Sequence, residues 1–366
     1  RIATAVRPGD LPVRLGGDEF AVLLSDGATE GAATALADRL IRVLAEPFRL
    51  SGGPVPVRAS IGVATSPGGA DGTEEVLFRN ADLALYAAKA DGKGTWRLFD
   101  PGLYDAALHR LALRTGLDRA LVAGEFELHY QPIVELQGDP RVAGYEALVR
   151  WRHPKLGLLA PSHFVPLAEE TGQIGPIGAW ILRTAVAEAA AGDFGYVAVN
   201  VSPNQFTGGG FVETVRTALR DGGLPPDRLT VEITETVFLH EATADALVDL
   251  ETLSLLGVRI AIDDFGTGYS SIGYLRDLKF DLIKADKSFV DRIVDLADHE
   301  LLLRGIVHVA GTMGIAVVAE GVETPAQRDL LREMGCAYAQ GFLYSPAVPL
   351  KETAEVRAAI EKGDNR

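Results

Sequence analysis

The chain shows two successive patterns of apolar and polar residues, and the pattern changes near residue 102. In residues 1–101, short strand-like runs separate two Ala-rich segments whose apolar residues have helical spacing. We expect strands at Val13–Leu15, Ala21–Leu24, Val55–Ala64 and Trp96–Phe99, and helices at Ala28–Leu44 and Val76–Asp91. The residues from Gly16 to Phe20 predict a tight hairpin turn that carries two acids at its tip. This part of the chain is therefore expected to be a mixed α+β unit.

Residues 102–124 have the pattern of a connector helix. Apolar residues with helical spacing run through this segment, and we expect them to form its packed side: Leu103, Ala107, Leu111 and Leu117 to Leu121. The Asp and Arg residues between them are expected to face water.

From residue 125 to residue 366, strand-like runs alternate with helical ones. The expected strands are Glu127–Val134, Val142–Trp151, Tyr196–Ser202, Leu229–Thr234, Val258–Asp263, Leu282–Lys284, Ala316–Glu320 and Tyr338–Gly341. The expected helices are Pro161–Thr171, Ile177–Ala191, Phe211–Gly222, Ala242–Gly257, His299–Gly314 and Pro325–Met334. Eight strands alternating with helices over about 240 residues are typical of an α/β fold, the (β/α)8 barrel. Only Glu135 to Arg141 joins the first two strands, which is too short for a helical crossover, so we expect that pair to be antiparallel.

Composition restricts the classes of protein that remain. The chain has 366 residues, 47% hydrophobic and 23% charged, which is typical of globular proteins and long enough for two domains. No run of about 18 apolar residues is present, which argues against membrane contact in this part of the polypeptide. The net charge of −15 argues against binding of polymeric nucleic acid. The single cysteine, Cys336, excludes an intrachain disulfide and favours a cytoplasmic location. Because the chain starts at Arg1 inside an expected element, we expect a longer polypeptide with a sensor or an anchor upstream.

Two adjacent carboxylates, Asp263 and Asp264, end one of the expected barrel strands. Neighbouring side chains of a strand point to opposite faces, so both acids can serve one site only if the strand ends at this pair. Gly266 and Gly268 would let the backbone turn there. Adjacent carboxylates repel each other, and a divalent cation is a natural partner for them.

Other expected strands end in polar residues in the same way, and in a barrel the carboxyl ends of the strands meet at one face. The residues that the alternation of side chains places there are Glu146, Leu148, Arg150, Asn200, Glu232, Lys284, Asp286 and Glu320. Each alone has an ordinary structural explanation, such as a cap, a salt bridge or a solvated strand end. Together, the carboxylates and the amide form an oxygen-rich set suited to Mg²⁺ or Mn²⁺.

The chemistry favoured by this set is hydrolysis of a phosphodiester with two metal ions. The sequence shows no nucleophile–base pair, and His153, His163 and His308 are scattered. Two ions about 3.5–4 Å apart would bind the phosphate and lower the pKa of a bridging water. Lys284 could orient or deprotonate that water, and Arg150 could hold a phosphate oxygen.

Several stretches of the barrel region resemble the signature motifs of EAL-domain cyclic di-GMP phosphodiesterases. They are Glu146-Ala147-Leu148 followed by Arg150, Asn200-Val201-Ser202, Glu232-Ile233-Thr234-Glu235, Asp263 to Ser271, Ala319 to Glu323, and Gln340-Gly341-Phe342. The segment from Ile283 to Asp286 is similar to a Leu-Lys-Ile-Asp strand of the family and keeps its Lys and Asp. The similarity runs from about Tyr130 to Ser345 and shows no departure at a catalytic position.

The resemblance implies a role for each of these residues. One metal ion would be held by Glu146, Asn200, Glu232 and Asp263, and the other by Asp263, Asp264 and Glu320. Lys284 would contact the nucleophilic water and act with Asp263 and Glu320 in catalysis. The implied substrate contacts are Gln131, Leu148, Arg150, Asp286 and Gln340, and the implied supports of the loop after Asp264 are Glu235 and Glu323. The product would be the linear dinucleotide pGpG.

Residues 1–101 resemble the C-terminal part of a GGDEF domain, the diguanylate cyclase family. The motif itself is intact and consists of Gly16, Gly17, Asp18, Glu19 and Phe20. Arg7 and Asp10 match the RxxD pattern of the family's inhibitory site, and Lys89 and Lys93 lie where the family contacts the triphosphate. The family's first strand, with its metal-binding Asp, and its guanine-binding helix are absent from these residues. The resemblance therefore implies a partial domain with a regulatory role, which we do not expect to make cyclic di-GMP from GTP.

The leading hypothesis is a metal-dependent phosphodiesterase that hydrolyses cyclic di-GMP and forms a homodimer. A non-catalytic receptor for the dinucleotide is the alternative from another class. A bifunctional cyclase and phosphodiesterase in the full-length protein is a third. The complete set of metal ligands and the intact loop from Asp264 to Ser271 favour the enzyme.

Overall fold

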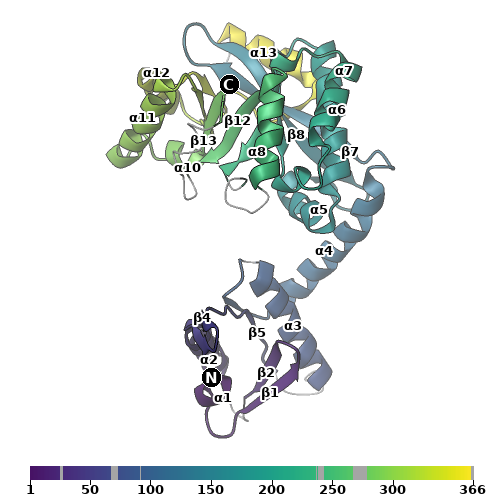
Figure 1. Cartoon of the computed structure of the whole chain (residues 1–366), viewed down its shortest axis with the longest axis vertical. Helices are drawn as coiled ribbons and strands as arrows, with labels where there is room; N and C mark the ends of the chain where they lie inside the picture. Colours follow the sequence, from purple (N-terminus) through teal and green to yellow (C-terminus); the bar gives the residue numbers. More distant parts are fainter. Residues whose placement is uncertain are drawn as a thin grey trace. The chain divides into compact units, whose positions relative to one another are not determined.

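The computed structural model describes residues 1–24, 28–66, 73–90, 92–235, 237, 243–266 and 278–363. The chain forms two compact units, Arg1–Thr115 and Gly116–Arg366, and the division falls within helix α4, Pro101–Ala120 (Figure 1). Most of the expected loop after Asp264, including Gly268 and Ser271, lies outside the described residues. The same holds for Asp91, the expected end of a helix in the first unit.

The first unit combines short strands with two long helices. Its elements before α4 are α1 (Ile2–Ala5), β1 (Leu11–Gly16), β2 (Glu19–Leu23), α2 (Glu30–Ala45), β3 (Phe48–Leu50), β4 (Gly53–Val55), β5 (Ile61–Val63), α3 (Glu74–Ala90) and β6 (Trp96–Leu98). The expected hairpin is confirmed, because β1 and β2 are antiparallel with Arg14 opposite Phe20. Helix α3 packs closely on β5, since a Cβ at Gly62 would lie 1.9 Å from the Ala81 carbonyl oxygen.

The expected strand Val55–Ala64 is wrong as a single element. β4 ends at Val55, β5 begins at Ile61, and the residues between them have no regular structure. Pro56 lacks a backbone N–H and cannot donate to a strand ladder, which accounts for the interruption.

The connector helix exists, but its expected packed side is wrong in part. Leu111 is 60% exposed, whereas Leu113, Leu117 and Ala120 are buried. Leu117 and Ala120 belong to the second unit, as does Gly116. There, a Cβ on Gly116 would lie only 3.1 Å from the Trp151 ring, so glycine permits the close approach. Spacing alone identified the helix but not which apolar positions are covered.

The second unit contains a closed barrel surrounded by helices. Its strands are β7 (Phe126–Glu135), β8 (Arg141–His153), β9 (Gly157–Leu159), β10 (Tyr196–Val201), β11 (Leu229–Thr234), β12 (Arg259–Phe265), β13 (Leu282–Ala285), β14 (Ala316–Ala319), β15 (Tyr338–Ala339) and β16 (Val348–Pro349). Its helices are α5 (Val165–Thr171), α6 (Ile174–Ala191), α7 (Phe211–Gly222), α8 (Thr243–Leu255), α10 (Lys287–Val290), α11 (Ala297–Thr312), α12 (Pro325–Met334) and α13 (Thr353–Lys362). Short 3₁₀ turns occupy Pro161–His163, Pro203–Gln205, Pro226–Arg228 and Leu350–Glu352.

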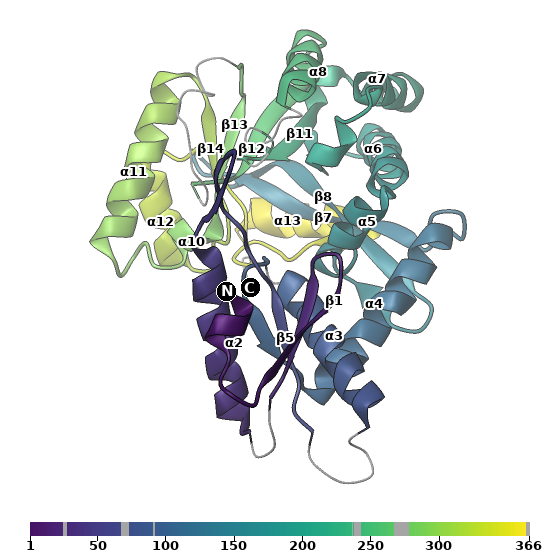
Figure 2. The same cartoon turned by 60° about the horizontal axis from the view of Figure 1, so that its bottom comes forward.

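Eight strands close the barrel in the order β7, β8, β10, β11, β12, β13, β14 and β15, with β15 pairing back to β7. The neighbours from β8 to β15 are parallel, and β7 is antiparallel to both β8 and β15. The expected antiparallel first pair is therefore confirmed. Helices α6, α7, α8, α11 and α12 lie outside the ring of strands (Figure 2), and this explains why β14 and residues 196–199 of β10 are apolar on both faces.

An apolar layer fills the lower part of the barrel. It includes Ile133, Tyr196, Ala198, Ala261, Leu282 and Val318. Tyr196 is accommodated by Gly144 on the neighbouring strand, where a Cβ would lie 2.6 Å from the tyrosine ring. The layer combines the bulky Tyr196 and Leu282 with the small Ala198 and Ala261, so the interior is packed with side chains below the functional end.

The boundaries of several elements differ from expectation by a few residues. The segment Pro161–Thr171 is a 3₁₀ turn followed by α5, with Phe164 between them. The strand that carries Asp263 and Asp264 does not end at this pair but continues to Phe265. Its pairing with β13 shifts register between Ile262 and Phe265. No helix within the described parts of the chain is both long and apolar enough to cross a bilayer.

Candidate active site

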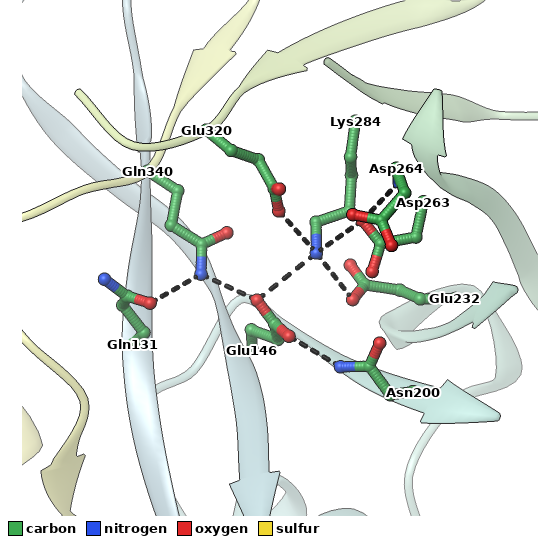
Figure 3. Close-up of polar contacts among 9 residues, drawn as sticks. All are labelled: Gln131, Glu146, Asn200, Glu232, Asp263, Asp264, Lys284, Glu320 and Gln340. Atoms are coloured by element: carbon green, nitrogen blue, oxygen red, sulfur yellow. Dashed lines mark hydrogen bonds and ion pairs between the residues drawn. The ribbon is translucent and has the colours of Figure 1, made fainter. Parts of the chain in front are cut away.

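The candidate site is the layer of side chains directly above the apolar layer of the barrel. On the parallel strands, each site residue lies two positions after an inward-facing residue: Glu146 after Gly144, Asn200 after Ala198, Glu232 after Thr230, Asp263 after Ala261, Lys284 after Leu282, Glu320 after Val318 and Gln340 after Tyr338. Asn200 lies opposite Glu232 in the register of β10 and β11. Figure 3 shows that these side chains, with Gln131 and Asp264, point toward one another.

Lys284 lies at the centre of this ring and is 1% exposed. Its Nζ is 2.8 Å from a Glu320 oxygen and 2.9 Å from a Glu232 oxygen (Figure 3). The same atom is 3.3 Å from an oxygen of Glu146 and 3.3 Å from one of Asp263. One buried ammonium therefore contacts four carboxylates that come from four other strands or strand ends.

Amide side chains hold Glu146 from the other side. The Asn200 amide donates to Glu146 at 2.6 Å, and the Gln340 amide donates to its second oxygen at 2.7 Å. The Gln340 nitrogen also donates to the Gln131 side-chain oxygen at 3.0 Å, and Gln131 in turn donates to the Ser345 carbonyl. Both donations fix the orientation of the Gln340 amide. Its oxygen is buried and has no hydrogen-bond partner within the described structure.

Asp263 and Asp264 face the same site because the backbone adopts a left-handed conformation at Asp264. Asp264 has a φ of +53°, in the left-handed region that Asp tolerates better than most residues. Its N–H donates to the Asp263 carboxylate at 3.0 Å. One oxygen each from Asp263, Asp264 and Glu320 lie within 4.8 Å of one another, a grouping that could hold a metal ion. The left-handed residue thus replaces the expected end of the strand.

Burial and charge shift the pKa values of these groups in different directions. Burial raises the pKa of Glu146. The Lys284 charge and the amide hydrogen bonds lower the pKa by a larger amount, so the net shift is downward. Burial raises the pKa of Glu232 well above its usual value, and it raises that of Glu320 to about 7. Burial and the neighbouring Asp263 raise the pKa of Asp264. Burial lowers the pKa of Lys284, but the four carboxylates outweigh it, and the net pKa is well above normal.

Other residues singled out from the sequence lie at the edge of this ring. Leu148 and Arg150 are half-buried on β8, and Arg150 donates to the neighbouring Val149 carbonyl. Asp286 caps α10 by accepting from the Ser288 N–H. Its charge also raises the pKa of Asp264, which places the two acids near each other.

The two expected loop supports differ in their surroundings. Glu235 is buried, and one of its carboxylate oxygens has no hydrogen-bond partner within the described structure. Glu323 is exposed and accepts a 2.6 Å bond from Lys287.

In the first unit, Arg7 and Asp10 form a local turn in which the Arg7 N–H donates to the Asp10 side chain. The residues from Gly16 to Phe20 are exposed on the β1–β2 hairpin.

Two contacts near the site had no signal in the sequence pattern. Glu169 on α5 accepts a 2.6 Å bond from the Ser202 hydroxyl, just beyond Asn200. Ser345 supplies the carbonyl that holds Gln131. A polar hollow of about 850 Å³ also lies between α5, α6 and α7, lined by residues such as Gly172, Asn204 and Phe211, and it includes none of the ring residues.

Residues 114–347 match the family model described as the EAL domain. The chain belongs to the EAL-domain family. Every residue of the ring falls within the part matched to the EAL domain. Residues 1–95 match the model described as the diguanylate cyclase GGDEF domain, so the chain has the tandem order GGDEF then EAL.

Curated relatives match nearly the whole of this chain. It is 41% identical over 358 residues to the bifunctional diguanylate cyclase/cyclic di-GMP phosphodiesterase MucR of Pseudomonas aeruginosa, covering 96% of this chain and 52% of MucR. It is 39% identical over 360 residues to the cyclic di-GMP phosphodiesterase NbdA of the same species, covering 97% of this chain and 46% of NbdA. The chain therefore spans about half the length of these relatives.

A solved structure of an EAL domain has the same fold. The PaMucR phosphodiesterase in complex with c-di-GMP is 41% identical, with a TM-score of 0.62. The match covers 66% of this chain and 99% of that one.

Proposed function

We propose that the EAL domain of this chain hydrolyses cyclic di-GMP to linear pGpG with the help of divalent metal ions. The observation that carries the proposal is the single ring of Glu146, Asn200, Glu232, Asp263, Asp264, Lys284 and Glu320 at the carboxyl ends of the barrel strands. The similarity to proteins named as cyclic di-GMP phosphodiesterases, and to one solved with that dinucleotide, supports the choice of substrate.

The donor set fits hard divalent cations. Carboxylate and amide oxygens are the ligands that Mg²⁺ and Mn²⁺ prefer, and thiolate or imidazole ligands are absent from the ring. Five carboxylates and the Lys284 ammonium give the ring a formal charge of −4, which two divalent cations would balance. We assign one cation to Glu146, Asn200, Glu232 and Asp263, and the other to Asp263, Asp264 and Glu320. Bound ions of this kind supply positive charge that lowers the pKa of a water and stabilises the transition state.

The residues of the chain then orient the reactants. In hydrolysis, a water oxygen forms a new bond to phosphorus, one P–O bond to a ribose oxygen breaks, and that oxygen takes a proton. Lys284 would orient this water or deprotonate it, because its Nζ lies among the carboxylates assigned to the ions. Arg150 would hold a phosphate oxygen. Gln340 presents its unpartnered oxygen as an acceptor, with its amide fixed by Gln131.

The remaining residues are proposed to shape the site around the substrate. Leu148 and Asp286 would contact the dinucleotide at the rim, beside Arg150 and Asp264. Glu235 and Glu323 would support the loop after Asp264.

We infer that the unit before the barrel regulates rather than catalyses. We propose domain limits of 1–101 for the GGDEF unit, 102–124 for the connector helix and 125–366 for the EAL barrel; the family models match residues 1–95 and 114–347. Arg7 and Asp10 are exposed or half-buried in a turn where they could bind product dinucleotide. The residues from Gly16 to Phe20 are intact, which keeps a bifunctional full-length protein as the second candidate.

We further propose a cytoplasmic homodimer. Cys336 is a free, buried cysteine, as expected in a reducing compartment. Helix α11 exposes Leu302 and Val309, which lie seven residues apart, and Met313 follows four residues after Val309. These helical spacings form an apolar stripe that is available for a second copy. Sedimentation of the purified chain would test this state.

The activity is tested by incubating the purified chain with cyclic di-GMP and Mg²⁺ or Mn²⁺ and following the products by chromatography. We expect pGpG in the presence of either metal and none with EDTA. Binding of cyclic di-GMP without turnover in either metal would favour the non-catalytic receptor instead.

A further inference from the structure

Lys284 carries more negative partners than it has protons to donate. An ammonium group has three N–H bonds. Its nitrogen lies within 3.3 Å of oxygens of four different carboxylates, those of Glu146, Glu232, Asp263 and Glu320. Its side chain is 1% exposed, and those of Glu146 and Glu232 are 6% and 2% exposed. Solvent therefore contributes little to the balance of charge around Glu146 and Glu232.

Buried carboxylates without a counter-charge are costly, and removing one partner of a buried ion pair is strongly destabilising. The amides of Asn200 and Gln340 help Glu146 but carry no charge. For Glu232, the cationic partner found in the described structure is Lys284. The ammonium is thus the group that keeps the carboxylates together in the metal-free chain.

We propose that Lys284 is the resident counter-cation of this site: it holds the metal ligands in place before a divalent ion binds, and it competes with that ion for their oxygens. The proposal rests on the metal site assigned under the proposed function. It goes beyond orientation of a water, because it gives Lys284 a role when neither metal nor substrate is present.

Competition follows from the shared acceptors. A divalent ion such as Mg²⁺ binds carboxylate oxygens at about 2.0–2.1 Å, and it draws their charge away from other donors. Glu232 and Glu320, whose oxygens lie 2.9 and 2.8 Å from Nζ, are among the residues assigned to the ions. Removing the ammonium charge should therefore have two opposite effects. The metal-free chain becomes less stable, and its affinity for the divalent ion increases.

The test compares Lys284→Met with the wild type and with Lys351→Met. Methionine keeps the length and most of the volume of lysine but not its charge. Lys351 is the matched control, because it also carries one positive charge in the second unit but its side chain is 79% exposed. The unfolding temperature is measured in EDTA and across an Mn²⁺ titration, and Mn²⁺ affinity is measured by calorimetry.

For Lys284→Met we expect the unfolding temperature in EDTA to fall by on the order of 10 °C. We expect Mn²⁺ to bind at least about 10-fold more tightly than to the wild type and to restore most of the lost stability. Lys351→Met should match the wild type in both measurements. If the variant is unfolded in EDTA, recovery of the folded state with Mn²⁺ supports the proposal.

A variant that stays unfolded at saturating Mn²⁺ would overturn the proposal, because the ion should replace the missing charge. Unchanged stability in EDTA together with unchanged Mn²⁺ affinity would overturn it as well. Hydrolysis of cyclic di-GMP by the wild type is measured in the same buffers. A wild type that binds Mn²⁺ and forms pGpG leaves the proposed function standing even if the role of Lys284 fails. A wild type that does neither sinks the proposed function itself.

Discussion

Substitution of Asp263 by Asn should lower turnover strongly but leave the unfolding temperature of the metal-free chain nearly unchanged. Asp263 is the carboxylate proposed to touch both metal ions, and Asn keeps its shape while removing its charge. Its Oδ1 lies 3.3 Å from the Lys284 nitrogen, so the lost attraction is about 5 kcal/mol at an effective dielectric constant of about 20. The hydrogen bond from the Asp264 N–H can remain, because the Asn side chain also offers an oxygen.

The repulsion that disappears is of similar size. Oxygens of Asp264 and Glu320 lie within 4.8 Å of Asp263, which corresponds to roughly 3.5 kcal/mol for each pair at the same dielectric constant. Asp264 is exposed, so solvent screening reduces its share by about half. The two effects nearly cancel, and the metal-free unfolding temperature of the variant should stay within a few degrees of the wild type.

Turnover should behave differently. Loss of one group that stabilises transition-state charge typically costs about 10²–10³-fold, and here two ions lose a ligand, so we expect at least about 10²-fold lower turnover with Mn²⁺. The gain in unfolding temperature on adding Mn²⁺ should shrink in parallel. Asp221→Asn on α7 removes the same charge from an exposed site and should change neither quantity. Wild-type turnover in Asp263→Asn would refute the assignment of Asp263 as the bridging ligand.

Four further outcomes follow from the structure. Ca²⁺ should bind the carboxylates but support little turnover, because it prefers six to eight oxygens at about 2.3–2.6 Å whereas Mg²⁺ needs about 2.0–2.1 Å; equal rates in a product assay would contradict this. Arg150→Ala should raise KM for cyclic di-GMP by about 10-fold or more with a smaller change in kcat, and an unchanged KM would remove Arg150 from the substrate contacts. Burial raises the pKa of the Cys336 thiol to about 12 from a usual 9.0, so the folded chain should resist thiol reagents at pH 8 while the unfolded chain reacts. The same shift stabilises the folded state fully below pH 9 and is lost as the pH rises toward 12, which a series of unfolding curves over that range would show.

The sequence predicted the ring because parallel strands impose a simple rule. Side chains two positions apart share a face, and parallel strands bring their carboxyl ends to one edge. Glu232, Lys284 and Glu320 therefore could be grouped without knowing any distance. The central place of Lys284 could not be predicted in this way. It depends on the tilt and stagger of β13 against its neighbours, which bring one nitrogen within 3.3 Å of four carboxylates.

The adjacent acids show where the alternation rule misleads. Strict alternation required the strand to end at Asp263 if Asp264 was to join the site. The chain instead keeps the strand to Phe265 and places Asp264 at a φ of +53°. Asp is among the few residues other than glycine that tolerate this region, so the residue type carried a hint. The hint was too weak to use, because most Asp residues in strands do not adopt that conformation.

The rule that site residues lie at the carboxyl ends of strands does not apply to Gln131, because its strand β7 runs in the opposite direction. β7 is antiparallel to both of its neighbours, so the functional end of the barrel lies toward its amino end. Gln131 accordingly comes two positions before the inward-facing Ile133, whereas Glu146 and Gln340 come two positions after their counterparts. The register confirms the layer, since Gln131 lies opposite Glu146. A reversed strand in a barrel therefore presents its site residue from mid-strand, where the sequence pattern looks like ordinary β structure. Closure of β15 onto β7 then brings Gln340 within 3.0 Å of a residue 209 positions earlier, and this contact fixes which way the Gln340 amide faces the site.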